Sequence, residues 1–526
     1  MTADRLVFGD HPSQLAWGIG DIARKRAQLT PDATAFVFED VPVTYHTLNV
    51  RVNQVAHALK KSGLKKGDRV ATLLFNGPAF IETYFAAAKL GAIFVPLNFR
   101  LVAPEIQYQL NNSGACLFIF DEQMTAEVAK IRNATSIRPG GFVVVTETPD
   151  LFEDYPQWVS PFESWIKAEP STEPHPDTPV SLMDPLAIIH TSGVTGNPKG
   201  AVVSHLQTYF KCMQVVMYTD MRSDDIFLAQ IPLFHSAGLS VVLTPVLFRG
   251  AAFLLRKHFD PSVFARDIEK YKPTIILALT TMWRFVLETG ELDRMDLSCV
   301  RQVLGGGERT PASLLETLAD RGIHLQQVFG QTENSAMMVL PGQDVHRKAG
   351  SVGMPGMCND VWIADENGQA VQPGTQGRIL ARGPTVMSGY WGMPEKTAES
   401  LSQEGVLDTG DIGFMDEDGY FYIVDRAKDM YRSGGENVYP AEVEKVLMQH
   451  AGIVHAAVVG VNDETWGEAG KAFVVLQKGA NLSLADLHRF LEGKLARYKY
   501  PRHLEVLDAL PLTASGKVHK AQLKKR

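Results

Sequence analysis

Apolar residues in the first part of the chain recur at two periods, which predict alternating helices and strands. Between residues 45 and 62 they lie on one face of a helix, at Leu48, Val52, Val55, Ala56 and Leu59. Short apolar runs at 69–75 and 92–96 predict buried strands, and residues 79–90 between them predict a second helix. Alternation of this kind is typical of parallel sheets covered by helices, so we expect an α/β fold.

The alternation of helices and strands is interrupted by a linker and later gives way to a glycine-dense region. A stretch rich in Pro, Glu, Ser, Thr and Asp at 169–184 predicts a surface linker, after which the alternation resumes from 186 to about 330. Between 350 and 424 glycines are dense, and Asn367-Gly368 and Asp418-Gly419 are hairpin turn signals. The pattern predicts a small antiparallel barrel or sheet in that region.

The last hundred residues return to a mixture of helix and strand. We therefore expect a large N-terminal domain over residues 1–425, made of two α/β subdomains and a small β-barrel-like subdomain. A hinge over residues 426–429 is expected to connect it to a smaller α+β C-terminal domain over residues 430–526.

Composition narrows the class of protein. The 526 residues are 45% hydrophobic and carry 51 basic against 59 acidic side chains, a net charge of −8, which argues against disorder and against a nucleic-acid partner. No apolar run reaches the roughly 18 residues of a membrane span, and the N-terminus lacks a secretory h-region. The four cysteines lack metal-ligand or redox spacing. We expect a cytoplasmic protein without an integral membrane segment, for which a homodimer remains open.

The richest chemical motif is His190-Thr191-Ser192-Gly193-Val194-Thr195-Gly196-Asn197-Pro198-Lys199-Gly200, which follows a strand-like apolar run. Its glycines let the backbone turn tightly and direct N–H groups at one centre, while hydroxyls and one lysine add further donors. This combination suits a polyphosphate. It is not a Walker A loop, because Gly-Lys-Ser/Thr is absent.

The segment resembles the phosphate loop of the acyl-adenylate-forming superfamily, which includes acyl-CoA synthetases, beetle luciferases and peptide-synthetase adenylation domains. The chain departs from the usual pattern at Val194, where a hydroxyl is expected. The resemblance extends from about residue 40 to residue 520. It implies that ATP is bound by Thr191, Ser192, Gly193, Thr195, Gly196 and Lys199.

Three further segments resemble the family's nucleotide site: 304–308, 329–333 and 409–411. The resemblance implies that Phe329 stacks on adenine, that the Thr332 hydroxyl meets the α-phosphate and that the Asp411 carboxylate accepts hydrogen bonds from ribose. It also implies that Glu333 supplies a hard carboxylate for Mg²⁺. The implied ATP- and AMP-binding set adds Gly307, Glu308, Gly330 and Gln331.

Segments 425–444 and 511–518 resemble the family's hinge, its CoA-binding loop and its C-terminal lysine motif. By resemblance, Arg426 contacts ribose and phosphate, Lys428 is the pivot of a mobile C-terminal domain, and Lys517 is catalytic. Ser433, Gly434, Gly435 and Glu436 would approach CoA. Glu442 and Glu444, just after Pro440, are expected only to complement a helix dipole.

The acyl site is expected around His235, Gly238, Gly305, Gly306 and Gly330. The resemblance places His235 near the substrate carboxylate, although a structural core histidine is also compatible with the sequence. Acetate-specific relatives carry Trp at the position of Gly330, so we expect a pocket open beyond two carbons. Lys499 and Arg502 could meet CoA phosphates or form a generic basic surface.

The resulting interpretation is an acid–CoA ligase that uses ATP, Mg²⁺ and coenzyme A. Lys517, Glu333, Thr332, Lys199 and His235 form the expected catalytic set. A medium- or long-chain fatty acid is the first interpretation, and a benzoate-, coumarate- or ferulate-type acid is the alternative. An amino-acid adenylation domain is disfavoured because no Asp follows Phe234, and a P-loop kinase because its motif is absent. A non-catalytic ligase-like binding protein is the remote alternative.

Overall fold

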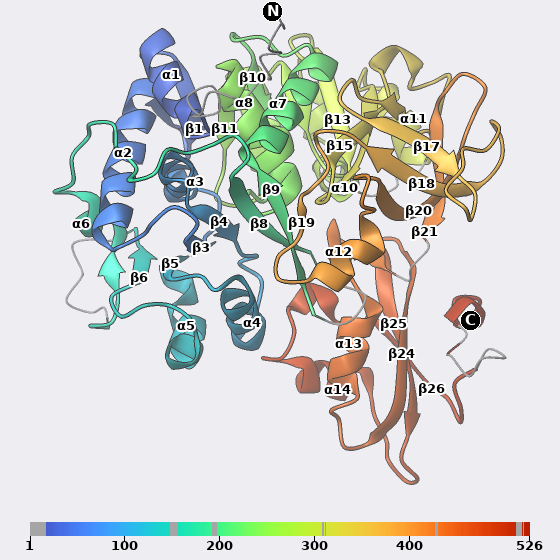
Figure 1. Ribbon diagram of the computed structural model, residues 1–526. Helices are drawn as coiled ribbons and strands as arrows, with labels where there is room; N and C mark the ends of the chain where they lie inside the picture. Colours follow the sequence, from blue (N-terminus) through green and yellow to red (C-terminus); the bar gives the residue numbers. More distant parts are fainter. Residues whose placement is uncertain are drawn as a thin grey trace, which may run out of the picture.

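The computed structural model describes residues 17–147, 156–191, 197–307, 310, 312–426, 430–511, 518 and 520–526. Four sheets organise these residues, two large ones in the N-terminal part, a small one after them and one near the C-terminus (Figure 1). Across those ranges, no helix combines the length and apolarity that a bilayer crossing needs.

The first large sheet has eight strands in the order β19-β9-β8-β4-β3-β5-β6-β7. Its inner strands β4, β3, β5 and β6 are parallel, and β9 returns antiparallel to β8. The strands are β3 (Arg69–Leu73), β4 (Ile93–Pro96), β5 (Leu117–Asp121), β6 (Phe142–Val145), β7 (Ser160–Pro161), β8 (Pro185–Thr191), β9 (Lys199–Ser204) and β19 (Gly389–Tyr390).

The second large sheet has nine strands in the order β16-β15-β14-β13-β12-β10-β11-β1-β2. Strands β14, β13, β12, β10, β11 and β1 run parallel to one another, whereas β15 and β2 are antiparallel to β14 and β1. The strands are β1 (Thr34–Phe38), β2 (Val41–Thr44), β10 (Ile226–Leu228), β11 (Ala252–Leu255), β12 (Ile275–Leu277), β13 (Gln302–Gly306), β14 (Leu325–Gln331), β15 (Ser335–Val339) and β16 (Met354–Pro355).

Helices cover both sheets, as the alternating pattern predicts. The N-terminal helices are α1 (Asp21–Leu29), α2 (Tyr45–Lys61), α3 (Pro78–Leu90), α4 (Ala103–Ser113), α5 (Thr125–Ile131), α6 (Phe162–Ile166), α7 (His205–Thr219), α8 (Thr244–Arg249), α9 (Pro261–Tyr271), α10 (Thr280–Glu288), α11 (Ala312–Ala319) and α12 (Pro394–Ser400). The helices predicted at 45–62 and 79–90 are confirmed as α2 and α3. Leu48 and Val52 of α2 are fully buried in the core that joins the two large sheets.

The glycine-dense region forms a four-stranded antiparallel sheet in the order β17-β18-β20-β21. Its strands are β17 (Asp360–Ala364), β18 (Gly377–Arg382), β20 (Leu407–Met415) and β21 (Phe421–Arg426). Of the two predicted forms, barrel or sheet, the structure has the sheet. Gly368 and Gly419 both have positive φ, at 81° and 86°, which agrees with their prediction as turn residues.

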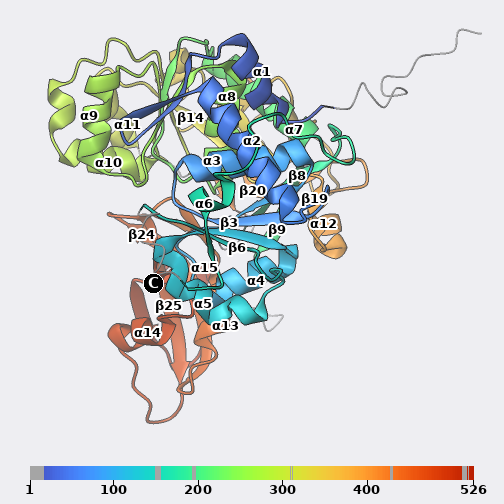
Figure 2. The ribbon, with the colours of Figure 1, turned by 90° about the vertical axis from the view of Figure 1, so that its left-hand side faces the viewer.

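The C-terminal domain is a five-stranded sheet with helices packed on it. In both views it lies below the large sheets, next to α4 (Figures 1 and 2). The helix predicted to begin at Pro440 is confirmed as α13. The elements are β22 (Tyr431–Ser433), β23 (Glu436–Val438), α13 (Pro440–Leu447), β24 (Ile453–Asp463), β25 (Gly467–Leu476), α14 (Leu484–Leu491), β26 (His503–Val506) and α15 (Lys520–Leu523).

Candidate active site

A cavity of about 690 Å³ opens where parallel strands of the nine-stranded sheet end. Residues at or just after the carboxyl ends of β10, β12, β13 and β14 line it, and the C-terminal domain closes its other side. Binding sites form at this edge in α/β sheets because the loops that leave the strand ends diverge there. The cavity therefore joins residues from nearly the whole chain.

The predicted phosphate loop connects the antiparallel strands β8 and β9. Thr191 and Lys199 are paired across this hairpin and both line the cavity. Ser192, Gly193, Thr195 and Gly196 lie outside the described residues. The hairpin thus places the loop's lysine and its first hydroxyl at the cavity edge, where they are suited to a phosphate group.

Glu333 lies beside this hairpin and is oriented by Tyr390. The Tyr390 hydroxyl donates a hydrogen bond of 2.8 Å to Glu333 Oε1. The ammonium of Lys199 lies 4.5 Å from the centre of the same phenol ring, a cation–π contact. Tyr390 is 8% exposed, and it joins the residue proposed for the metal to the residue proposed for the phosphates.

The Glu333 carboxylate at the cavity edge is compatible with Mg²⁺. Mg²⁺ is usually held by one or two carboxylates together with substrate phosphates rather than by an all-protein cage. Among the described residues, no group of three or more His, Cys, Asp or Glu side chains converges in the way that a dedicated cation site would require. Glu333 therefore fits a cation that arrives with a nucleotide.

A buried lysine contributes positive potential near Glu333. Lys211 of α7 is 2% exposed. Burial lowers the pKa of Lys211 to about 8, and the charge of Glu333 opposes that shift. The sequence pattern did not mark this lysine, because a lysine in an amphipathic helix is usually solvated.

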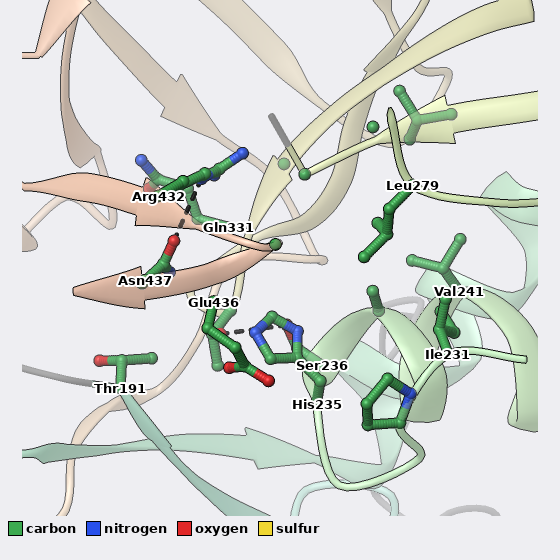
Figure 3. Close-up of a pocket in the computed structure, with 18 of the residues that line it drawn as sticks. Thr191, Ile231, His235, Ser236, Val241, Leu279, Gln331, Arg432, Glu436 and Asn437 are labelled. Atoms are coloured by element: carbon green, nitrogen blue, oxygen red, sulfur yellow. Dashed lines mark hydrogen bonds between the residues drawn. The ribbon is translucent and has the colours of Figure 1, made fainter. Parts of the chain in front are cut away.

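Thr332 and His235 lie between the nucleotide side and the apolar side of the cavity. Thr332 Oγ1 and Ser236 Oγ are 3.0 Å apart and share a hydrogen bond. Figure 3 shows His235 between Glu436 on one side and the apolar side chains Ile231, Val241 and Leu279 on the other. Burial lowers the pKa of His235, so its ring is neutral at neutral pH and does not attract a carboxylate by charge.

Asp411 lies deeper in the nucleotide side of the cavity. Its Oδ2 accepts a hydrogen bond of 2.6 Å from Gln331 Nε2, which also donates to the Thr409 carbonyl. Asp411 is 1% exposed yet lines the cavity. The backbones of Asp411 and Arg426 are paired between β20 and β21. The structure thus brings together Gln331, Asp411 and the Arg426 backbone, while Glu308 lies outside the described residues.

Four of the glycines predicted for the nucleotide and acyl sites line the cavity, namely Gly305, Gly306, Gly307 and Gly330. At Gly330 a Cβ atom would lie 1.7 Å from the Ser335 carbonyl oxygen, so the close approach of β14 and β15 excludes any side chain there. Glycine at this position permits the close packing of the two strands, and the role of Gly330 in the size of the acyl pocket stays a prediction.

Two residues predicted for the nucleotide and acyl sites lie elsewhere. Gly238 is not among the cavity-lining residues, and its Cβ position is 2.2 Å from the Pro232 carbonyl oxygen, so it permits close backbone packing behind His235. Phe329 is half-buried and packs against the core of the small sheet, with Met337 and Ile363. The residues of β14 that line the cavity next to Phe329 are Gly330 and Gln331.

The predicted CoA-binding segment is the tip of a hairpin that enters the cavity. Ser433 and Glu436 are paired between β22 and β23, with Gly434 (φ 58°) and Gly435 (φ 81°) as the two turn residues. Positive φ at both positions is typical of the tight turns that join twisted strands. A Cβ atom on Gly434 would lie 2.8 Å from the Trp466 ring, and one on Gly435 would lie 2.7 Å from Leu279 Cδ1. Glycine therefore leaves a narrow passage between these two side chains.

Polar contacts hold this hairpin and its domain against the N-terminal part. Glu436 forms an ion pair with Arg100 at 2.6 Å. Lys445 Nζ donates to Asn197 Oδ1 at 2.9 Å, and Arg284 donates to the Glu464 carbonyl at the same distance. Lys428 and Lys517 lie outside the described residues. Val518, next to Lys517 in the chain, packs with Val459 and Phe473 of the C-terminal sheet.

Two family models match the chain, the AMP-binding enzyme at residues 23–391 and the AMP-binding enzyme C-terminal domain at residues 442–517. The chain belongs to the AMP-binding enzyme family. Curated relatives place it among the AMP-forming acid–CoA ligases of that family, which use ATP and CoA. It is 39% identical to a feruloyl-CoA synthase of Amycolatopsis sp over 97% of this chain and 99% of the relative. It is 36% identical to an indoleacetate–CoA ligase of Aromatoleum aromaticum, over 94% and 95% of the two chains.

Two solved structures of one relative match this chain to different degrees. A double mutant of o-succinylbenzoate CoA synthetase from Bacillus subtilis, bound with its product analogue, matches with a TM-score of 0.86 and 30% identity over 96% of this chain and 98% of that one. The same enzyme in complex with its acyl-adenylate intermediate covers 96% and 97% but has a TM-score of 0.69 at 31% identity. The structure of this chain is thus more similar overall to the product-analogue complex than to the acyl-adenylate complex of that enzyme.

Proposed function

We propose that the chain is an aromatic acid–CoA ligase that activates a phenylpropenoid or similar aryl acid, with ferulate as the first candidate. The observation that carries this proposal is the 39% identity to a feruloyl-CoA synthase over nearly the full length of both chains. The indoleacetate and succinylbenzoate ligases among the relatives also act on ring-bearing acids. These relatives support the aryl alternative better than the fatty-acid interpretation that the sequence patterns favoured.

The apolar side of the cavity is compatible with a planar ring. Beyond His235 it is lined mainly by aliphatic and aromatic side chains, with the glycines of β13 and β14 on one wall. An apolar slot of this kind favours a flat hydrophobic group whose carboxylate remains at the polar end. The members of this apolar set are Ile231, Val241, Leu277, Leu279, Met282 and Phe285.

In the first half-reaction the carboxylate oxygen attacks the α-phosphorus of ATP, giving acyl-AMP and releasing pyrophosphate. The phosphate loop with Thr191 and Lys199 holds the triphosphate, and Asp411 and Arg426 hold the ribose. Bound Mg²⁺, held by Glu333, would neutralise phosphate charge. Lys517 supplies positive charge where the α-phosphate becomes more anionic in the transition state.

In the second half-reaction the CoA thiol attacks the acyl carbon, and AMP leaves. The C-terminal domain pivots at Lys428, within the proposed hinge at 426–429, between two orientations. In one it presents Lys517, and in the other it presents the Gly434–Gly435 turn. The passage between Trp466 and Leu279 then admits the narrow pantetheine arm to the acyl carbon.

A panel of acids tests the substrate class. Pyrophosphate release is measured with ferulate, coumarate, benzoate, indoleacetate, octanoate and palmitate, each with and without CoA. We expect ferulate or coumarate to give the highest kcat/KM, and thioester to form only when CoA is present. A higher kcat/KM for octanoate or palmitate than for every aryl acid would contradict the aryl proposal.

A further inference from the structure

A buried ion cluster joins the two domains at a distance from the cavity. Lys499 Nζ lies 2.6 Å from Glu105 Oε1 and 2.7 Å from Glu442 Oε1. The side chains of Lys499, Glu105 and Glu442 are 2%, 8% and 7% exposed. Glu105 is in the first turn of α4 in the N-terminal domain, whereas Glu442 and Lys499 both belong to the C-terminal domain.

The sequence predicts other roles for two of these residues. It predicts that Lys499 meets CoA phosphates or lies on a basic surface, and that Glu442 only complements a helix dipole. The structure places Lys499 between two carboxylates and out of contact with solvent. Burial acts to lower the pKa of Lys499, but Tyr498, Glu442 and Glu105 around it hold that pKa well above its usual value. The lysine is therefore a permanent cation in a site that excludes water.

The cluster contains one cation and two carboxylates, and the cation comes from the C-terminal domain. Glu442 Oε2 is buried and has no hydrogen-bond partner among the described residues. Glu105, for its part, is buried chiefly against the C-terminal domain's lysine and is otherwise bonded to the Val102 amide of its own helix. Burial raises the pKa of Glu105, and Lys499 opposes that shift. Glu105 thus depends on Lys499 for charge compensation in this arrangement.

The cluster can exist in only one of the two domain orientations. A movement that carries the C-terminal domain away from α4 keeps Lys499 with Glu442 but separates it from Glu105. A contact that is present in one of two states shifts the equilibrium toward that state by its own free energy. Removing one partner of a buried ion pair is strongly unfavourable, because an uncompensated charge remains.

We propose that Glu105 and Lys499 are positioning residues that hold the C-terminal domain in the thioester-forming orientation. This inference rests on the proposed two-step ligase function. Neither residue touches the cavity, so the pair acts on the second half-reaction through the position of the Gly434–Gly435 hairpin. The first half-reaction, which uses the other orientation, does not depend on the contact between them.

The test separates the two half-reactions in the full-length enzyme with Glu105→Gln and Glu105→Asp. Glu105→Asp keeps a carboxylate at the helix N-terminus, as Asp486 provides in α14, but is one methylene too short to reach Lys499. Acyl-AMP formation is followed in a single turnover with acid and MgATP, and thioester formation is then followed after CoA is added. We expect both variants to slow thioester formation at least about tenfold and to leave acyl-AMP formation within about twofold of the wild type.

Glu127→Gln is the matched control. Glu127 accepts a hydrogen bond from the Ala103 amide at the same end of α4, so its loss disturbs that helix terminus without removing a contact to Lys499. We expect both half-reactions to be unchanged in this variant. Equal slowing of the two steps by Glu105→Asp, or no slowing of thioester formation, would overturn the positioning role. A wild-type enzyme that forms no acyl-AMP with any acid would instead contradict the proposed function.

Discussion

The Tyr390 hydroxyl donates a hydrogen bond of 2.8 Å to Glu333 Oε1, and the ring of Tyr390 lies 4.5 Å from the Lys199 ammonium. One phenol therefore positions both the carboxylate proposed for Mg²⁺ and the lysine proposed for the triphosphate. Burial and the charge of Glu333 both raise the pKa of Tyr390, so the hydroxyl stays protonated and remains a donor.

Tyr390→Phe removes this hydrogen bond but keeps the ring beside Lys199. Because a hydrogen bond to a charged group contributes about 1.5–3 kcal/mol, we expect kcat/KM for MgATP to fall on the order of tenfold. The Mg²⁺ concentration for half-maximal pyrophosphate release should rise. Tyr271→Phe is the control, since its hydroxyl also donates to a carboxylate, that of Asp40, at 2.7 Å on the surface. If the two variants behaved alike, Tyr390 would have no specific role.

The metal prediction concerns Glu333 itself. EDTA should stop pyrophosphate release, and added Mg²⁺ should restore it. Glu333→Gln removes the charge without changing the size of the side chain, and we expect adenylation to fall on the order of 100-fold and to recover partly at high Mg²⁺. An unchanged Mg²⁺ titration curve in Glu333→Gln would show that the cation is held elsewhere.

The CoA passage is tested at Gly435. Gly435→Ala places a methyl group 2.7 Å from Leu279 Cδ1 in a residue with φ 81°. We expect thioester formation to slow about tenfold or more while acyl-AMP formation is retained. Gly419→Ala introduces similar backbone strain, at φ 86°, with no atom within 4 Å of the added Cβ. The two variants should therefore lose similar thermal stability, and only Gly435→Ala should lose the second step.

Lys517→Ala should impair the first half-reaction and spare the second, the opposite of the effect expected for Gly435→Ala. Because its charge is proposed to act in adenylation, we expect acyl-AMP formation to fall on the order of 100-fold or more. Thioester formation from acyl-AMP supplied in advance should be close to the wild-type rate. A variant that makes acyl-AMP normally from acid and ATP would contradict the catalytic assignment of Lys517.

Much of the fold could be predicted from the sequence because it depends on neighbours in the chain. The period of Leu48, Val52, Val55 and Leu59 predicts α2, whose apolar face is buried as expected. Turn glycines such as Gly434 and Gly435 are required by the local backbone conformation, which has positive φ at both positions. They predict a hairpin but not its position in the fold. The hairpin of the phosphate loop is also formed by residues that are close together in the chain.

The partners of Lys499 could not be predicted in this way. Its contact with Glu105 spans 394 residues and exists only because two domains pack against each other. From the sequence alone a lysine is expected to be solvated. The carboxylates that offset the desolvation cost of burying Lys499 come from distant elements, so no local pattern marks them. Tyr390 is a similar case, since nothing in its spacing connects it with Glu333, 57 residues earlier.

The sequence by itself identified the family to which this protein belongs, and it predicted the phosphate loop, the catalytic carboxylates and the hinge segment. Only the tertiary structure decided which of these residues meet, that Phe329 and Gly238 pack outside the cavity lining, and that the Gly434–Gly435 turn occupies the cavity edge. The physical reason is that residue type and short-range periodicity specify local conformation and reactivity. The burial and pairing of charges across two domains depend on long-range packing, which no local pattern encodes.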